Sequence, residues 1–296
     1  MYVLVLCVIS FIISLCRSTA VPFDREIAGA AVWFSADAYC PLIELPTRDW
    51  VGPTTGFTYV GTILDAPSDT QGYFGVHHRS HSVWIVFRGT TTARDWMSDA
   101  ALWQVPEWEE ECMGCMVHFG FKKCKDAVLA QVTAAVQQLL QSHPNYRIII
   151  TGHSLGGAIA SLIAVDLAHI LPSHNIVLYT FGSPRVGNAA TSAHANAVLP
   201  RAVRITHLQD VVPHLPTESR GYVHFPHEVY EDENHQLVFC EGADDAACAE
   251  QWKLRDTNAM DHMLYLNHGM HCDSADNTAA VEAAAAIANH LNVEME

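Results

Sequence analysis

The sequence predicts an α/β fold, with a central, mostly parallel sheet flanked by helices. Strand-like segments rich in β-branched and aromatic residues alternate with segments of helical periodicity. One of the strand-like segments, residues 146–152, runs through a glycine-rich turn directly into a helical pattern. Such alternation is typical of parallel strands connected by covering helices. At 296 residues with 50% hydrophobic composition, the chain can bury one large core, so we expect a single domain.

Six segments have the composition of strands and are bounded by Gly, Pro, Asp or Asn. They cover residues 56–66, 72–79, 82–89, 146–152, 175–182 and 202–210. Helical patterns fall between several of them. From Phe121 to Leu140, apolar residues recur at three- and four-residue steps, and Pro144 ends the pattern. We expect a second helix after Ser154 and an alanine-rich helix at residues 277–291.

The first twenty residues have the features of a secretory signal peptide. They are apolar from Val3 to Leu15 and end in Ser18-Thr19-Ala20, a small-residue pattern typical of cleavage sites. We therefore expect a signal peptide at 1–20 and a secreted, extracellular domain at 21–296. The apolar run is short for a membrane span, which needs about 20 residues. The absence of Lys or Arg before it leaves a signal anchor as the alternative.

Charge and motifs exclude several function classes. The net charge of −16 would repel the phosphates of nucleic acids, so nucleic acid is not an expected partner. No Walker loop, dinucleotide fingerprint or zinc-protease motif is present, so we expect no cofactor and no metal. The pairs His224/His227 and His268/His271 have the spacing of metal ligands. In a chain with 18 histidines we interpret them as surface residues, and we expect a monomer without an integral membrane span.

The cysteines suggest a disulfide-stabilised protein, because secretion would place them in an oxidising compartment. Of the nine, Cys7 and Cys16 lie in the first twenty residues. The remaining spacing favours three bonds: Cys112 with Cys115 as a local bridge, Cys240 with Cys248 around a small acidic loop, and Cys40 with Cys272 between the two ends of the domain. Cys124 is then left over as a buried free thiol on the apolar face of a helix.

The turn after residues 146–152 indicates a nucleophilic serine. It reads Gly152-His153-Ser154-Leu155-Gly156, the G-x-S-x-G pattern of a strand-to-helix turn. The glycines fit where strand and helix leave no room for side chains. Ser154 would then lie at the N-terminus of a helix, where backbone N–H groups and the helix dipole stabilise developing negative charge. The alternative is a structural turn whose serine only caps the helix.

A nucleophilic serine needs a histidine base and an acid that orients it, and in α/β-hydrolases these follow in the order acid, then histidine. Asp210 stands at the end of the strand-like segment 202–210, where parallel sheets place their functional groups. His262, His268 and His271 follow it. Periodicity does not choose among these three histidines.

Six segments in sequence resemble the secreted fungal-type lipases, the class 3 lipase family of the α/β-hydrolase superfamily. They are IVFRGT, VHFGF, ITGHSLGGAIA, FGSPRVGN, QDVVPHLP and DHMLY, and they are spread over residues 85–265. The resemblance implies an α/β-hydrolase fold with Ser154, Asp210 and His262 as catalytic triad. Asp261 is then structural, and His268 is the alternative base.

The resemblance also implies an oxyanion hole built from the backbone N–H of Leu155 and from Thr90, whose backbone N–H and hydroxyl would both donate. Asp99 matches a position that supports this threonine by a hydrogen bond once the site is open. His118 and His153 match family positions that serve packing and hydrogen bonding. Removing an oxyanion donor typically costs about 3 kcal/mol of transition-state stabilisation.

The segment after Thr90 matches the position of the family's lid, a short helix over the active site. Its residues support this expectation independently, because four apolar side chains fall on one helical face. These are Ala93, Trp96, Met97 and Ala100. That face could cover the site in water or turn towards lipid. A surface helix packed permanently on the core is the alternative.

The resemblance implies a secreted serine lipase that hydrolyses acylglycerol esters through an acyl-enzyme, with the lid opening at a lipid–water interface. A feruloyl esterase or a phospholipase is the alternative within the family, because these keep the triad and change the lid and acyl groove. From another class, the alternative is a catalytically silent protein that binds lipid or cell wall, against which the intact triad argues. We interpret the acidic run from Glu107 to Glu111 as a solvated loop.

Overall fold

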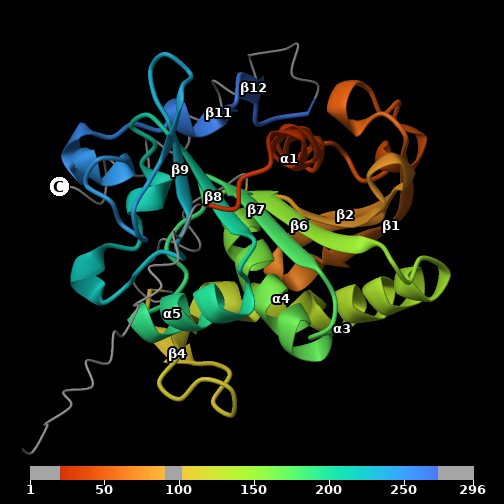
Figure 1. Cartoon of the computed structure of the whole chain (residues 1–296), viewed down its shortest axis with the longest axis horizontal. Coiled ribbons are helices and arrows are strands. Elements are labelled where there is room, and N and C mark those ends of the chain that lie inside the picture. The colour runs from red at the N-terminus through yellow and green to blue at the C-terminus, as the bar shows by residue number, and fades with distance from the viewer. Residues whose placement is uncertain (1–20, 91–101, 273–296) are drawn as a thin grey trace, which may run out of the picture.

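The computed structural model describes residues 21–90 and 102–272. Within these ranges, eight strands form one sheet in the order β1-β2-β3-β6-β7-β8-β9-β10 (Figure 1). These strands are β1 Phe57–Asp65, β2 Thr70–His77, β3 Ser82–Phe87, β6 Arg147–His153, β7 Ile176–Phe181, β8 Ala202–His207, β9 Glu228–Glu231 and β10 Leu237–Phe239. The strands from β3 to β9 are parallel, and the pairs at both edges are antiparallel. The predicted α/β class with a mostly parallel central sheet is confirmed.

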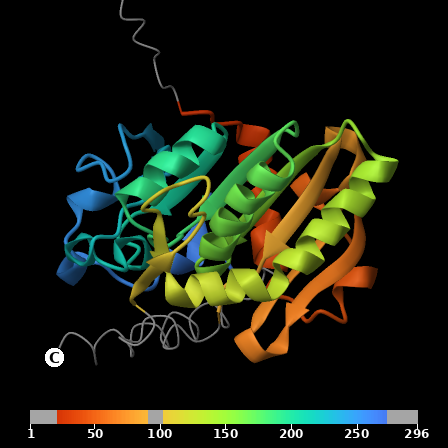
Figure 2. The same cartoon turned by 90° about the horizontal axis from the view of Figure 1, so that it is seen from below.

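Helices cover both faces of this sheet. Helix α1 (Arg25–Asp37) lies on one face, and α3 (Phe119–Ser142), α4 (Leu155–Ile170) and α5 (Ala189–Val198) lie on the other (Figures 1 and 2). The strands supply both cores because successive side chains point to opposite faces. In β3, Trp84 and Val86 belong to the core under α1, whereas Val83 and Ile85 belong to the core under α3 and α4.

Each of the six predicted strand segments contains a strand, and the two described helices predicted from periodicity are α3 and α4. The sequence analysis missed α1, α5 and the last two strands of the sheet. It also missed two small antiparallel pairs, β4 (Gln104–Pro106) with β5 (Met116–His118) and β11 (Leu264–Tyr265) with β12 (His268–Gly269). The expected signal peptide at 1–20 and C-terminal helix at 277–291 lie outside the described residues, as does the expected lid.

Three disulfide bonds occur within the described residues. They join Cys40 to Cys272, Cys112 to Cys115 and Cys240 to Cys248, the pairs that the sequence spacing favours. Cys124 is a free cysteine on α3 and is half-buried rather than buried, with Sγ 3.8 Å from the carbonyl oxygen of Ser68. Over the described part of the chain, no helix combines the length and the apolar character that crossing a membrane requires.

Candidate active site

The turn between β6 and α4 holds Ser154 in a strained conformation. Its φ is 58° and its ψ is −131°, a region that residues with a side chain rarely adopt. Close packing on both sides explains the flanking glycines. A Cβ at Gly152 would lie 2.4 Å from the backbone of Gly156, and a Cβ at Gly156 would lie 2.4 Å from the carbonyl oxygen of Phe87. The strained serine is thus presented at the start of α4, as the G-x-S-x-G pattern predicts.

Asp210 and His262 are hydrogen-bonded to each other. Asp210 follows β8, and His262 lies in the short 3-10 helix Asp261–Met263. Nδ1 of His262 donates to Oδ2 of Asp210 over 2.8 Å, and both side chains are only 1% exposed. This bond leaves Nε2 as the basic nitrogen of the imidazole. Nε2 is buried and has no hydrogen-bond partner among the described residues, so it is available to accept a proton.

Two further donors hold the Asp210 carboxylate. The backbone N–H of Val212 donates to Oδ1 over 2.8 Å, and the hydroxyl of Tyr265 donates to Oδ2. Burial raises the pKa of Tyr265 well above its ordinary value of 10, and the charge of Asp210 raises it further, so the phenol stays protonated. The sequence analysis did not single out Tyr265, although it is the last residue of the DHMLY segment.

His153 connects the serine turn to the loop that carries His262. Its Nε2 donates to the carbonyl oxygen of His262 over 2.8 Å, and the two ring centroids are 4.3 Å apart. Its Nδ1 then accepts from the hydroxyl of Tyr39 at 2.7 Å. Burial lowers the pKa of His153 well below 6.5, and His262 lowers it further when it is protonated, so the His153 ring is neutral. His153 therefore fixes the residue next to Ser154 relative to the candidate base.

The segment leading to Thr90 lies directly against the serine. A Cβ at Gly89 would be 2.9 Å from the carbonyl oxygen of His153 and 3.0 Å from Cβ of Ser154. The half-buried Thr90 follows at once. Leu155 is the first residue of α4, and the first N–H groups of a helix have no partner within the helix. The two proposed oxyanion donors therefore belong to segments that meet at Ser154, whereas Asp99 lies outside the described residues.

The other two candidate histidines, His268 and His271, make contacts away from Asp210. His268 stacks on Trp33, with ring centroids 4.5 Å apart, and Nδ1 of His271 donates to the carbonyl oxygen of Cys272 over 3.1 Å. Of the three candidates left open by periodicity, the structure brings His262 to Asp210.

The interpretation of the paired histidines as surface residues is wrong for His224, His268 and His271. These side chains are 3%, 8% and 5% exposed because they pack in the interior. His224 and His227 both hydrogen-bond to backbone carbonyl groups. His118 is also fully buried, and its Nδ1 accepts from the backbone N–H of Phe121 at the start of α3.

The interpretation of the acidic run from Glu107 to Glu111 as a solvated loop is wrong for Glu107. Glu107 is only 8% exposed and forms ion pairs with Lys122 and with the buried Lys125. Lys125 also pairs with Asp166, 3.0 Å away. Burial alone would lower the pKa of Lys125, but the neighbouring carboxylates raise it above 10.5, so the ammonium stays charged. Sequence reasoning missed this network because Glu107 and Lys125 are 18 residues apart on different elements.

Comparisons with known proteins identify the family. The family described as Lipase (class 3) matches residues 84–220, which include Ser154 and Asp210. A lipase from Rhizomucor miehei is 30% identical over 250 residues, covering 80% of this chain and 67% of that protein. The chain belongs to the class 3 lipase family.

Solved structures of lipases share the fold. The Rhizomucor miehei lipase in complex with its propeptide has a TM-score of 0.75 at 27% identity, covering 84% of this chain and 82% of that one. A triacylglycerol lipase described as having a serine protease triad at its catalytic centre has a TM-score of 0.74 at 27% identity, covering 83% of this chain and 95% of that one.

A second relative by sequence is the secreted mono- and diacylglycerol lipase A of Penicillium cyclopium, which is 35% identical over 192 residues. The match covers 64% of this chain and 59% of the Penicillium enzyme, so this chain spans less than two thirds of that relative's length.

Proposed function

We propose that this class 3 lipase is a secreted serine hydrolase that cleaves acylglycerol ester bonds, with Ser154 as nucleophile, His262 as base and Asp210 as the acid that orients the base. The observation that carries the proposal is the buried Asp210–His262 pair, in which Nε2 of His262 has no hydrogen-bond partner among the residues that the structure describes. The strained Ser154 at the N-terminus of α4 supports it. No cofactor is needed for this chemistry.

Each step follows from one of these groups. Ser154 Oγ attacks the ester carbonyl while Nε2 of His262 accepts its proton, and Asp210 stabilises the resulting imidazolium. His262 then protonates the departing alcohol oxygen, which leaves an acyl group on Ser154. A water molecule, deprotonated by His262, hydrolyses this acyl-enzyme and restores the serine.

The oxyanion would be held by Thr90 and by the backbone N–H of Leu155. The close packing of Gly89 against Ser154 supports this assignment, because Thr90 is the residue directly after Gly89. The positive end of the α4 dipole favours the same charge. Asp99 would orient Thr90, as the resemblance implies.

The substrate class rests on the relatives' names and on the residues expected in the lid. The Penicillium relative is named as a secreted mono- and diacylglycerol lipase and the Rhizomucor relative as a lipase. The apolar set Ala93, Trp96, Met97 and Ala100 favours a substrate that is insoluble in water, because such a face can rest on lipid. We propose that the enzyme acts as a monomer on esters at a lipid–water interface.

The first experiment measures the initial rate of hydrolysis against tributyrin concentration, from below to above its solubility limit. A sharp rise when droplets appear supports a lidded lipase. The single variants Ser154→Ala, His262→Ala and Asp210→Ala should lose nearly all activity while keeping the circular dichroism spectrum of the folded enzyme. Full activity of His262→Ala would refute the triad assignment.

The same experiment separates the alternatives. Smooth saturation below the solubility limit keeps the triad but indicates a hydrolase of soluble esters, such as a feruloyl esterase. A properly folded wild-type protein without any esterase activity would instead favour a binding protein.

Secretion is tested separately. If residues 1–20 are a signal peptide and 21–296 form the mature domain, the protein recovered from culture medium should begin at Val21. Retention in the membrane fraction with an intact N-terminus would support the signal anchor.

A further inference from the structure

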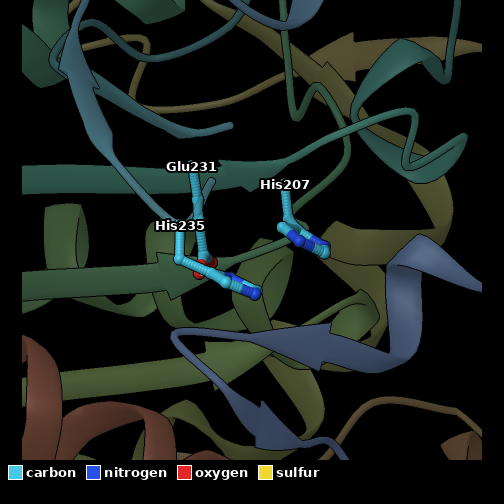
Figure 3. A group of neighbouring side chains, drawn as sticks. All are labelled: His207, Glu231 and His235. Carbon is cyan, nitrogen blue, oxygen red and sulfur yellow. The ribbon is translucent and has the colours of Figure 1, made fainter. Parts of the chain in front are cut away.

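Three potential metal ligands meet at the ends of two neighbouring strands. His207 is the last residue of β8, Glu231 is the last residue of β9, and the two are direct partners in the parallel ladder. His235 lies four residues further on, in the turn between β9 and β10. Figure 3 shows the three side chains extending into the same region. One ligand atom from each residue lies within 4.8 Å of the other two.

His207 has the orientation of a metal ligand. Its Nδ1 donates to the backbone carbonyl oxygen of Asp261 over 3.0 Å, so the lone pair is on Nε2. The side chain is only 2% exposed, and Nε2 has no hydrogen-bond partner among the described residues. A buried acceptor without a donor is costly. Histidines that bind metals are commonly held in this way, with the other ring nitrogen donating to a carbonyl group.

Glu231 provides a buried carboxylate whose hydrogen bonds also hold it in place. It is 1% exposed, accepts from the backbone N–H of Leu266 over 2.7 Å through Oε2, and accepts from Nδ1 of His235 over 2.9 Å through Oε1. The ion pair described for Glu231 is with His235, which is charged only when protonated. A buried carboxylate is normally paired with a cation or bound to a metal.

A second carboxylate lies beside the cluster. The backbone carbonyl oxygen of Asp261 accepts from Nδ1 of His207, and Oδ2 of Asp261 accepts from the backbone N–H of Gln209 over 3.0 Å. A bound dication would offset part of the negative charge of Glu231 and Asp261.

We propose that His207, Glu231 and His235 bind a divalent transition-metal ion, with Zn²⁺ as the ion that their chemistry favours. Two imidazoles and one carboxylate are a common zinc ligand set, and water supplies the fourth position. Bonds of about 2.0–2.1 Å to a tetrahedral Zn²⁺ bring ligand atoms to about 3.3 Å from one another. The ligands must therefore draw together, and His235 can move because its side chain is 41% exposed in a turn.

Such an ion would stabilise the loop that carries the candidate base. It would join β8, β9 and the following turn, and its ligands already bind the backbone of Asp261 and Leu266 on either side of His262. None of the three ligands belongs to the proposed triad. The site is therefore structural, and its failure would leave the proposed function untouched.

The test compares zinc binding by untagged wild-type protein with that of His235→Asn and of the control His81→Asn. Both histidines are exposed and have positive φ, 57° for His235 and 48° for His81, a conformation that asparagine adopts readily. Metal-free protein is titrated with Zn²⁺ in competition with a chromogenic chelator. We expect one tight site per chain in the wild type and in His81→Asn, and an affinity at least about tenfold lower in His235→Asn.

Glu231→Gln provides a second variant, because the amide keeps an acceptor for Leu266 but removes the charge. Zn²⁺ should raise the melting temperature of the wild type and of His81→Asn, and raise it much less in the other two variants. Co²⁺ should give the visible absorption of a four-coordinate site in the wild type and in His81→Asn, but not in His235→Asn or Glu231→Gln. Equal zinc affinity in all variants would mean that other histidines bind the ion, and this or the absence of saturable binding would overturn the proposal.

Discussion

The hydroxyl of Tyr265 donates to Oδ2 of Asp210, the same oxygen that accepts the Nδ1 hydrogen of His262. The phenol therefore helps to fix the carboxylate in the plane where it holds the imidazole. Because burial and the charge of Asp210 raise the pKa of Tyr265 well above its ordinary value, the phenol keeps this hydrogen at neutral pH.

Removing this hydroxyl should slow the reaction without changing substrate binding. In Tyr265→Phe, we expect kcat on a soluble ester to fall about tenfold with little change in KM, because a hydrogen bond to a charged group contributes about 1.5–3 kcal/mol and only part of it acts on the transition state. Tyr179→Phe is the control, since its hydroxyl contacts the backbone of Asp24 instead. An unchanged kcat would show that Tyr265 does not position the acid.

Gly182 is the position where a single methyl group should disrupt the site. Its φ is 55°, and an added Cβ would lie 2.7 Å from both Asp210 Oδ2 and the Tyr265 hydroxyl, and 2.9 Å from Cε1 of His262. We expect Gly182→Ala to lose about 100-fold in activity, since displacements near 1 Å have effects of this size. The variant should also unfold at lower urea concentration.

Gly29→Ala is the matched control for this variant. Gly29 lies inside α1, and a Cβ there would meet nothing within 4 Å. Alanine should stabilise the helix by about 0.5–1 kcal/mol and leave activity unchanged. Activity losses of similar size in both variants would contradict the steric explanation.

The buried Lys125 should be important for stability rather than for catalysis. Replacing it by Met leaves Asp166 in the interior without its ammonium partner and leaves Glu107 with Lys122 alone. We expect Lys125→Met to lose about 3–5 kcal/mol of unfolding free energy, measured by urea denaturation at neutral pH. The exposed Lys123 provides the control, as Lys123→Met should change stability by less than about 0.5 kcal/mol. A loss of less than about 1 kcal/mol of unfolding free energy in Lys125→Met would argue against a paired network.

Stability should decrease as the pH falls from about 6.5 to about 4. Burial and the charge of Arg185 lower the pKa of His214 to about 4, and burial and the charge of His271 lower that of His268 to about 4. As the pH falls, these two histidines gain protons in the unfolded chain at a higher pH than in the folded protein. Their contribution to the free energy of unfolding is therefore complete above the unfolded pKa of about 6.5 and is lost towards pH 4. The urea concentration at the midpoint of unfolding should therefore decrease as the pH is lowered from about 6.5 to about 4.

Two variants test the assignment of this pH dependence. His214→Gln and His268→Gln each remove one titrating group, so each should give a shallower decrease of the urea midpoint between pH 6.5 and pH 4 than the wild type. Parallel curves for the wild type and both variants would mean that other groups cause the loss.

The sequence predicts a functional residue best where the residues that shape its surroundings are its neighbours in the chain. The turn around Ser154 is predicted in this way, because the strand, the glycines and the helix that form it follow one another. The position of Asp210 near the serine is also predictable, because the carboxyl ends of parallel strands share one edge of the sheet.

Other features depend on contacts that periodicity does not contain. His262 could be distinguished from His268 only by family resemblance, because both lie in an irregular segment whose path is set by packing. Helix α1 combines a clear N-cap at Asp24 with nearly continuous burial, so its polar face is too short to give an amphipathic pattern. The pairing of His207 with Glu231 follows from strand register, which the residues near each position do not specify.

The disulfide between Cys40 and Cys272 closes a covalent ring, since the two cysteines are 232 residues apart. Ser154, Asp210 and His262 all lie inside this ring. If a protease cuts one exposed loop between the two cysteines, the resulting fragments remain joined, and every residue of the proposed triad stays attached to the rest of the sheet. A first cleavage would therefore leave a nicked but undivided molecule, and two cuts would be needed to release a piece of the active site.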